Sequence, residues 1–227
     1  MTSVVYEGWE LKFFDKATKY RKYQFSLIKD HLKGNVGEIG PGNGIFLEFY
    51  KTLANKINLF EPSINFLNIL KEKKIDNVKI YNSCFIEKPL FYDTLLYLDV
   101  LEHIEEDYGE LKKAYNSLKV GGKLVLNVPA YQFLFSNFDK DVNHYRRYTK
   151  KNFLELVRPL KFSKINIKYY DSIGFFLSLM SKIIVQDYKK NFDMKIKIWN
   201  KLIPFSKILD VITFHSFGKS LIAVCKK

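Results

Sequence analysis

The feature that most constrains this chain is a cluster of three glycines between an apolar stretch and an amphipathic one. In the sequence VGEIGPGNGIF, residues 36 to 46, Gly40, Gly42 and Gly44 follow an acidic residue, Glu38. Glycine adopts backbone conformations that other residues avoid, so this pattern predicts a sharp turn from a buried strand into a helix. Because such a turn lets a small ligand approach the backbone, we expect a ligand-binding loop here.

The rest of the sequence alternates short apolar segments with amphipathic ones. The pattern predicts strands at 35–39, 57–61, 78–82, 93–99, 122–128, 161–170 and 219–227, and helices at 19–34, from 44, at 63–73, at 107–119 and after Thr149. We expect Gly121 and Gly122 to end the helix at 107–119. The series is typical of an α/β fold of the Rossmann-like kind: a seven-stranded, parallel-dominated sheet with helices on both faces, and a C-terminal helical insertion before the last strand.

Charge and cysteine content limit the partners and the compartment. The net charge of +13 suggests nucleic acid or an anionic membrane, but only four of the 37 basic residues are arginine. The lysines are scattered along the chain, so we do not expect a nucleic-acid partner. Cys84 and Cys225 lie far apart without metal-ligand spacing, and the N-terminus lacks the layout of a secretion signal. These features favour a cytoplasmic protein.

The spacing of the glycines separates two classes of ligand. A dinucleotide fingerprint requires glycine at the first, third and sixth positions, and the sixth position counted from Gly40 is Ile45. The pattern therefore counts against an NAD(P)-dependent oxidoreductase. An acid beside the turn also suits a cationic ligand better than a phosphate.

Residues 38–44, with the pattern Glu-x-Gly-x-Gly-x-Gly, resemble the first motif of class I S-adenosylmethionine-dependent methyltransferases. Three further features follow in the family's order: Glu61, which ends a strand, the sequence YDTLLYLDVLEHI at 92–104, and GGKLVLNVP at 121–129. The resemblance extends over nearly the whole chain and is to members often associated with glycan or glycolipid pathways. It implies S-adenosyl-L-methionine as the cofactor and S-adenosyl-L-homocysteine as its product.

The resemblance also implies a set of donor-binding residues. Glu61 would accept hydrogen bonds from both ribose hydroxyls, and Asp99 would contact the methionine portion. The third strand offers no acid for the adenine, which would rely on Ser83 or on the backbone around Cys84. The full set is Glu38, Gly40, Gly42, Gly44, Glu61, Ser83, Cys84 and Asp99.

Methyl transfer from a sulfonium requires an aligned acceptor and, for a hydroxyl, a base. His103 and His144 follow the fourth and fifth strands, at the sheet edge where ligands bind, so we interpret them as the catalytic candidates. Asp99, Glu102, His103 and His144 could instead hold a divalent metal. Their spacing resembles that of metal-dependent small-RNA 2'-O-methyltransferases and ubiquinone O-methyltransferases. Many methyltransferases carry similar sequence without a metal, and we do not expect one.

The expected reaction is O-methylation of a small-molecule acceptor, with a sugar, a lipid-linked glycan or a quinone-like hydroxyl as the class; an RNA methyltransferase is the alternative. A single domain would comprise an N-terminal helical segment (1–34), a donor-binding core (35–170), a helical acceptor cap (171–217) and the last strand (218–227). The cap mixes aromatic residues with lysines. It either packs on the sheet with solvated lysines or rests on the anionic inner face of a membrane. The acceptor and the oligomeric state stay open.

Overall fold

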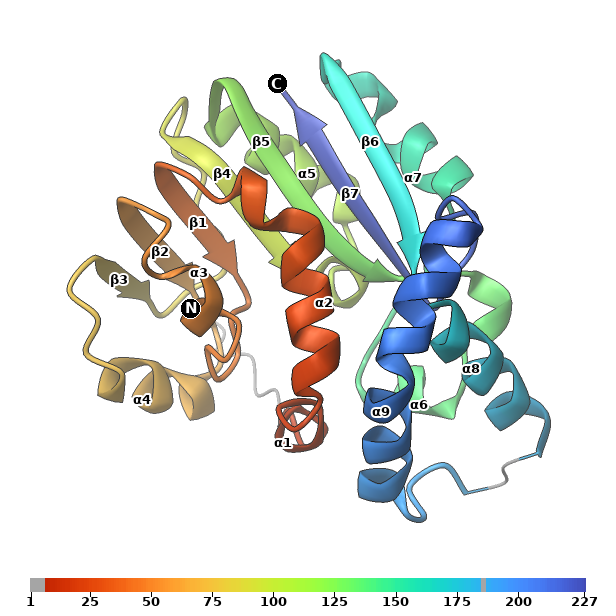
Figure 1. The fold of residues 1–227 in the computed structure, drawn as a ribbon. Helices are drawn as coiled ribbons and strands as arrows, with labels where there is room; N and C mark the ends of the chain where they lie inside the picture. The colour runs from red at the N-terminus through yellow and green to blue at the C-terminus, as the bar shows by residue number, and fades with distance from the viewer. Residues whose placement is uncertain (1–6, 185–186) are drawn as a thin grey trace.

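The structure is a computed structural model, and it describes residues 7–184 and 187–227. Its sheet has the strand order β3-β2-β1-β4-β5-β7-β6 (Figure 1). The strands are β1 (Asn35–Ile39), β2 (Lys56–Phe60), β3 (Val78–Tyr81), β4 (Tyr92–Leu98), β5 (Leu118–Pro129), β6 (Lys164–Tyr170) and β7 (Ser220–Lys226). All neighbouring pairs from β3 to β5 are parallel, and β7 is antiparallel to both β5 and β6. The predicted parallel-dominated sheet is confirmed.

Helices cover both faces of this sheet (Figure 1). On one face, α5 (Asp107–Ser117) and α7 (Lys150–Val157) supply residues to one apolar core. On the other face, α2 (Thr18–Ile28), α3 (Leu47–Tyr50) and α9 (Phe192–Ile212) supply a second core. The remaining α-helices of the described residues are α1 (Leu11–Phe14), α4 (Ile64–Glu72), α6 (Asn137–Asp141) and α8 (Ser172–Ile184).

The helix predicted at 19–34 ends earlier, since α2 stops at Ile28. The predicted end of the helix at 107–119 is also wrong. The glycine pair does not end α5, which stops at Ser117, because β5 begins at Leu118 and contains both glycines. The pairing of β4 with β5 passes from Tyr92 opposite Leu118 to Thr94 opposite Lys123, so β5 carries extra residues at this point. Glycine suits such an irregularity, since a side chain at the second of the pair would meet the backbone oxygen of Lys119 at 2.9 Å.

The C-terminal helical insertion packs against the N-terminal helix. The Tyr23 hydroxyl on α2 donates a hydrogen bond of 2.8 Å to Asp210 on α9. The side-chain oxygen of Asn200 accepts the backbone N–H groups of Lys19 and Tyr20, at 3.0 and 3.1 Å. Two segments about 180 residues apart in the sequence are therefore tied together beside the carboxyl ends of the parallel strands. Among the described helices, none is both long and apolar enough to cross a membrane.

Candidate active site

A cavity of about 700 Å³ lies at the carboxyl ends of β1, β2 and β4. The chain leaves β1 toward β2 and leaves β4 toward β5, so the connections diverge on the two sides of the β1–β4 pair. This divergence opens a crevice where ligands bind in α/β sheets. Side chains of α1, α2 and α9 form part of its wall. The cavity is thus built from the N-terminal, central and C-terminal parts of the chain.

The three glycines of the loop after β1 have two different roles. All have positive φ, at 62° for Gly40, 56° for Gly42 and 68° for Gly44, which disfavours other residues. Gly40 and Gly42 line the cavity, and Gly44 does not. A Cβ at Gly44 would lie 2.5 Å from Leu70 Cδ2 on α4, so this glycine lets the loop pack against that helix. Only the first two can therefore admit a ligand to the backbone.

Glu61, directly after β2, shapes the same loop. It is buried, and its two carboxylate oxygens accept the backbone N–H groups of Gly42 at 2.9 Å and Ser63 at 2.8 Å. Burial raises its pKa, although both hydrogen bonds oppose the rise. Each oxygen has further accepting capacity, and the carboxylate lines the cavity. The residue is therefore placed both to fix the glycine loop and to accept hydroxyls of a ligand.

Glu38 lies at the end of β1 and is almost completely buried. It accepts a hydrogen bond from the Tyr50 hydroxyl. Burial raises the pKa of Glu38 to about 7, the Tyr50 hydrogen bond and the positive charge of Arg21 lower it, and the negative charge of Glu61 raises it. A cation bound beside Glu38 would favour its ionised form.

Asp99 follows β4 and has a positive φ of 57°. Its side chain accepts a hydrogen bond of 2.5 Å from Asn127 and lies 3.5 Å from the guanidinium of Arg21 on α2. The Arg21 Nε atom is buried and has no hydrogen-bond partner within the described part of the chain. A negatively charged and a positively charged side chain, Asp99 and Arg21, therefore line the cavity together. Such a pair is suited to a zwitterionic group.

The residues after β3 differ in their access to the cavity. Cys84 lines it together with Phe85, whereas Ser83 does not. The Ser83 hydroxyl is buried and lacks a hydrogen-bond partner among residues 7–184 and 187–227. Cys84 lies in the loop after β3, not in a strand, and is exposed. The position favours the backbone around Cys84 over the Ser83 hydroxyl as a contact for a ligand.

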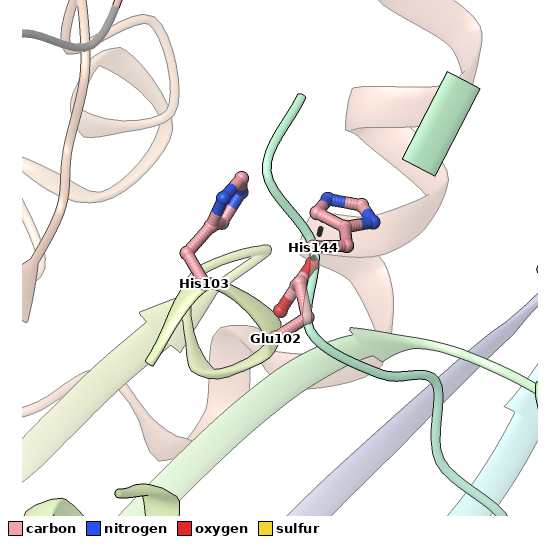
Figure 2. A group of neighbouring side chains, drawn as sticks. All are labelled: Glu102, His103 and His144. Atoms are coloured by element: carbon pink, nitrogen blue, oxygen red, sulfur yellow. Dashed lines mark ion pairs between the residues drawn. The ribbon is translucent and has the colours of Figure 1, made fainter. Parts of the chain in front are cut away.

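Two loops bring the histidines together, as Figure 2 shows. His103 lies in the turn at Leu101–His103 after β4, and His144 follows α6; their ring centroids are 4.6 Å apart. His144 Nδ1 lies 2.9 Å from Asp139 Oδ1, and its Nε2 lies 3.9 Å from Glu102 Oε1. Arg147 holds Asp139 through Nε and Nη2, both at 2.8 Å. The His144 ring is therefore oriented by a buried ion pair.

Burial sets the charge state of this cluster. Burial and the neighbouring His144 lower the pKa of His103 to about 3, so its ring is neutral near pH 7. Burial also raises the pKa of Glu102 well above its usual value. Burial opposes ionisation of Asp139 too, but hydrogen bonds from His144 and Arg147 hold its pKa well below the usual range. The site combines a neutral imidazole with an ionised carboxylate that orients its neighbour.

Three members of the alternative metal set lie close together. Ligand atoms of Glu102, His103 and His144 all fall within 4.8 Å of one another, and Asp99 is not part of the group. A carboxylate and two imidazoles can bind a divalent ion such as Zn²⁺. The Glu102 Oε2 atom is buried and has no hydrogen-bond partner within the part of the chain that is described. The residues present are compatible with such an ion.

Sequence patterns did not single out several cavity residues. Arg21 and Trp199 line the cavity from α2 and α9, and Lys219 lines it from the position directly before β7. None of them belongs to a local motif, and only the packing of the terminal segments brings them together. Asp139 and Arg147 flank His144 within eight residues, so a search for acids and bases near that histidine could have found them.

A family model described as a methyltransferase domain matches residues 14–169 of the chain. The tRNA U34 carboxymethyltransferase of Sulfurovum sp. (strain NBC37-1) is 32% identical over 114 residues. This match covers 46% of the present chain and 38% of that protein, so the chain spans less than two fifths of the relative's length.

Solved structures with the same fold include an S-adenosylmethionine-dependent methyltransferase of Archaeoglobus fulgidus. Its TM-score is 0.65 at 18% identity, with 96% of this chain and 97% of that chain covered. Phosphoethanolamine N-methyltransferase 2 of Haemonchus contortus, in complex with S-adenosyl-L-methionine, has a TM-score of 0.64 at 14% identity, with 94% and 56% covered. At these identities the likeness shows the fold.

Proposed function

The chain belongs to the methyltransferase-domain family, and from that premise we propose that it transfers the methyl group of S-adenosylmethionine to a hydroxyl of a small-molecule acceptor. One observation carries the proposal: a single cavity joins the glycine loop and Glu61 to His103 and His144. A donor site and a base for the acceptor are the two parts that O-methylation needs.

The donor is S-adenosylmethionine, and the cavity offers a partner for each of its parts. The loop at Gly40 and Gly42 receives the donor against the backbone, and Glu61 accepts the ribose hydroxyls. The backbone around Cys84 takes the adenine. Asp99 and Arg21, whose charges face the cavity together, suit the ammonium and carboxylate of the amino acid tail. In this assignment each charged group of the amino acid tail lies beside a side chain of opposite charge. The two histidines are then available to contact the acceptor.

His144 is the better base of the two histidines. The acceptor oxygen attacks the methyl carbon, the carbon–sulfur bond breaks, and S-adenosylhomocysteine leaves as a neutral thioether. The hydroxyl proton passes to His144 Nε2, because Nδ1 faces the ionised Asp139, which stabilises the imidazolium. His103, with a low pKa, is a weaker base and contacts the acceptor. No metal enters this scheme; an ion held by Glu102 and the two histidines would instead lower the pKa of the hydroxyl.

The acceptor class is proposed from the side chains that line the cavity. A sugar, a lipid-linked glycan or a quinone-like hydroxyl agrees with the mixture of polar and aromatic side chains in the cavity. An RNA acceptor is the alternative, favoured by the curated relative's name and by the net charge of +13. Within the described part of the chain, seven acidic residues line the cavity and outnumber its arginines and lysines, which counts against the repeated phosphates of an RNA backbone. The seven are Glu10, Asp15, Glu38, Glu61, Asp99, Glu102 and Glu110.

A membrane contact by the cap is a second part of the proposal. Apolar side chains, each about half exposed or more, follow one face of α9 at helical spacing; we name them the outer stripe, and they are Met194, Ile198, Phe205, Ile208 and Ile212. Exposed Lys201 lies within this face, and the exposed Lys197 and Lys207 lie elsewhere on α9. Two such helices would repel each other, whereas an anionic membrane surface complements both the charge and the apolar stripe.

Calorimetry with S-adenosylhomocysteine and with NADH tests the donor. We expect binding of the first alone. Glu61→Ala should weaken that binding by about 1.5 to 3 kcal/mol, the value of charge-assisted hydrogen bonds. Absence of S-adenosylhomocysteine binding would overturn the proposal.

Labelled donor, mixed with the small-molecule and RNA fractions of a cell extract, separates the two acceptor classes. We expect label in the small-molecule or lipid fraction. Label that appears in the RNA fraction and disappears after ribonuclease treatment would favour the alternative.

A further inference from the structure

Lys219 occupies a distinctive place in the cavity. It directly precedes β7, and Ser220 pairs with Pro129 at the carboxyl end of β5. The side chain lines the same cavity as Asp99, which follows β4. Neighbouring strands are about 4.8 Å apart, so Lys219 starts about 10 Å from the β4 edge, beyond β5. This is the side away from Glu61 and the glycine loop, where an acceptor would lie.

The Lys219 ammonium lacks a carboxylate partner. Its Nζ lies 4.3 Å from the ring centroid of Trp199 and 5.8 Å from that of Phe14. Within residues 7–184 and 187–227, no acid lies within ion-pair distance of this atom. Burial lowers the pKa of Lys219, although Asp171 opposes this. Lys219 is half-buried, and an ammonium whose close contacts are aromatic faces is an incomplete arrangement that an anion would complete.

The charged side chains that the structure describes near Lys219 are engaged in other interactions and do not form an ion pair with it. Asp171 receives hydrogen bonds from Trp199 Nε1 at 2.8 Å, from the Ser206 hydroxyl at 2.8 Å and from the Gly174 N–H at 3.0 Å. Its carboxylate is therefore committed to fixing the indole. On the other side, the charge of Arg147 is balanced by Asp139, as described above. Asp99 and Asp139 act on the Lys219 charge from a distance, as Asp171 does, but among the described residues none of the three forms an ion pair with it.

We propose that Lys219, stacked on Trp199, binds an anionic group of the acceptor, a carboxylate or a phosphate. The inference rests on the proposed function, since it names the class of acceptor for that same site. An ammonium pairs with either oxyanion, and the indole keeps the Lys219 side chain in place. The acceptor would therefore be an acidic small molecule whose hydroxyl reaches the histidines.

The indole of Trp199 provides a direct readout. The chain has two tryptophans, so a Trp9→Phe background leaves Trp199 as the single indole fluorophore. This protein is saturated with S-adenosylhomocysteine and titrated with methyl phosphate and, separately, with acetate at constant chloride. We expect a saturable fluorescence change with at least one of the two probes, and the stronger probe identifies the anion. Binding of S-adenosylhomocysteine is measured first, by calorimetry, so failure of the donor site is recognised separately.

Matched variants assign the effect to one residue. Lys219→Met, which keeps the side-chain length, should weaken anion binding about tenfold or more, while Lys219→Arg should largely retain it. Lys201→Met, on the exposed face of α9, should leave it unchanged. Affinity for S-adenosylhomocysteine should be equal in all variants, which also shows that each is folded. Equal anion affinity in Lys219→Met, or no saturable binding of either probe, would overturn the proposal. Weaker S-adenosylhomocysteine binding in Lys219→Met would assign the lysine to the donor's carboxylate instead.

Discussion

At the scale of single residues, Asp139 connects the structure of the site to its chemistry. It has no exposed surface, and it receives hydrogen bonds from Arg147 and contacts His144 Nδ1. The same carboxylate also accepts the backbone N–H of Ser136 at 2.8 Å and so caps α6. The loop that carries His144 is therefore folded by the residue that orients its ring.

Replacing His144 by Ala should lower kcat by about 10² to 10⁴, the usual range for loss of a general base. Binding of S-adenosylhomocysteine should persist, because the proposed donor contacts lie elsewhere. Asp139→Asn should lower kcat in the same direction, since it removes the charge that stabilises the imidazolium. Steady-state kinetics with donor affinity measured in parallel checks both variants, and Lys201→Met is the surface control.

A chelator distinguishes the base from a metal ion. If His144 acts alone, dialysis against a chelator leaves kcat unchanged. Loss of activity that returns with Mg²⁺, Mn²⁺ or Zn²⁺ would replace the base by an ion at Glu102, His103 and His144.

The raised pKa of Glu38 predicts that binding of the donor releases a proton. The pKa of about 7 in the unliganded protein means that most molecules carry a protonated Glu38 at about pH 6. A cationic donor favours the ionised form, so binding should release a proton at that pH, and donor affinity should rise with pH up to about 7 and then level off. Calorimetry in two buffers of different ionisation enthalpy measures the release. Glu38→Gln should abolish it; a release that persists in this variant would assign the proton to another group.

The sequence located the glycine loop better than the residues at the opposite end of the cavity. Gly40, Gly42 and Glu61 sit at fixed distances from strand ends, so local spacing was sufficient to place them at one edge. Trp199 and Lys219 belong to no such motif. Their positions depend on how α9 and β7 pack against the sheet. Hydrophobic periodicity predicts helices and strands but not such long-range packing.

At the scale of elements, predictions were best where burial dictates a short apolar run. The bounds of β1 were predicted without error, because its last four residues are buried and a glycine turn follows. Thr149 does begin α7, and its side chain accepts the N–H of Asn152 as a cap. The helix predicted from residue 44 is present only as the single turn α3, which has four residues. A helix of that length contains few intrahelical hydrogen bonds.

Binding to lipid vesicles tests whether the outer stripe of α9 contacts a membrane. We expect the protein to co-sediment with anionic vesicles at low salt, and not with neutral ones. High salt and the double variant Lys201→Glu, Lys207→Glu should reduce this binding. Lys189 is less suitable for substitution, because its Nζ already lies 2.8 Å from Asp141.

Apolar controls complete that experiment. Phe205→Ser should weaken vesicle binding, whereas Val120→Ser, which removes an apolar residue that is 88% exposed but outside the cap, should not. Failure to bind anionic vesicles at low salt would leave the simpler interpretation, in which the lysines are solvated and the cap only covers the sheet.

At the scale of the whole molecule, the cavity depends on contacts between the two ends of the chain. Tyr20 on α2 stacks on Tyr170 of β6, and their hydroxyls are 2.8 Å apart. Tyr170 donates to Asn127, which in turn donates to Asp99. A continuous hydrogen-bonded chain thus links the N-terminal helix to the strand ends that hold the site. Any change that loosens α2 should therefore disturb the position of Asp99.

This continuity predicts that the chain unfolds as one unit, with α9 and the sheet melting together. α9 packs against α2 and β6 and contributes Ile196, Trp199 and Ile203 to the same core as β1 and β2, so the cap cannot melt without exposing that core. Thermal unfolding followed by far-ultraviolet circular dichroism and by Trp199 fluorescence in the Trp9→Phe background should give coincident transitions. S-adenosylhomocysteine at 100 times its Kd should stabilise the native state by about 2.7 kcal/mol and raise both midpoints together, by about 5 to 10 °C. An earlier fluorescence transition, insensitive to the ligand, would instead show that the cap is a separate unit and that the donor site is complete without it.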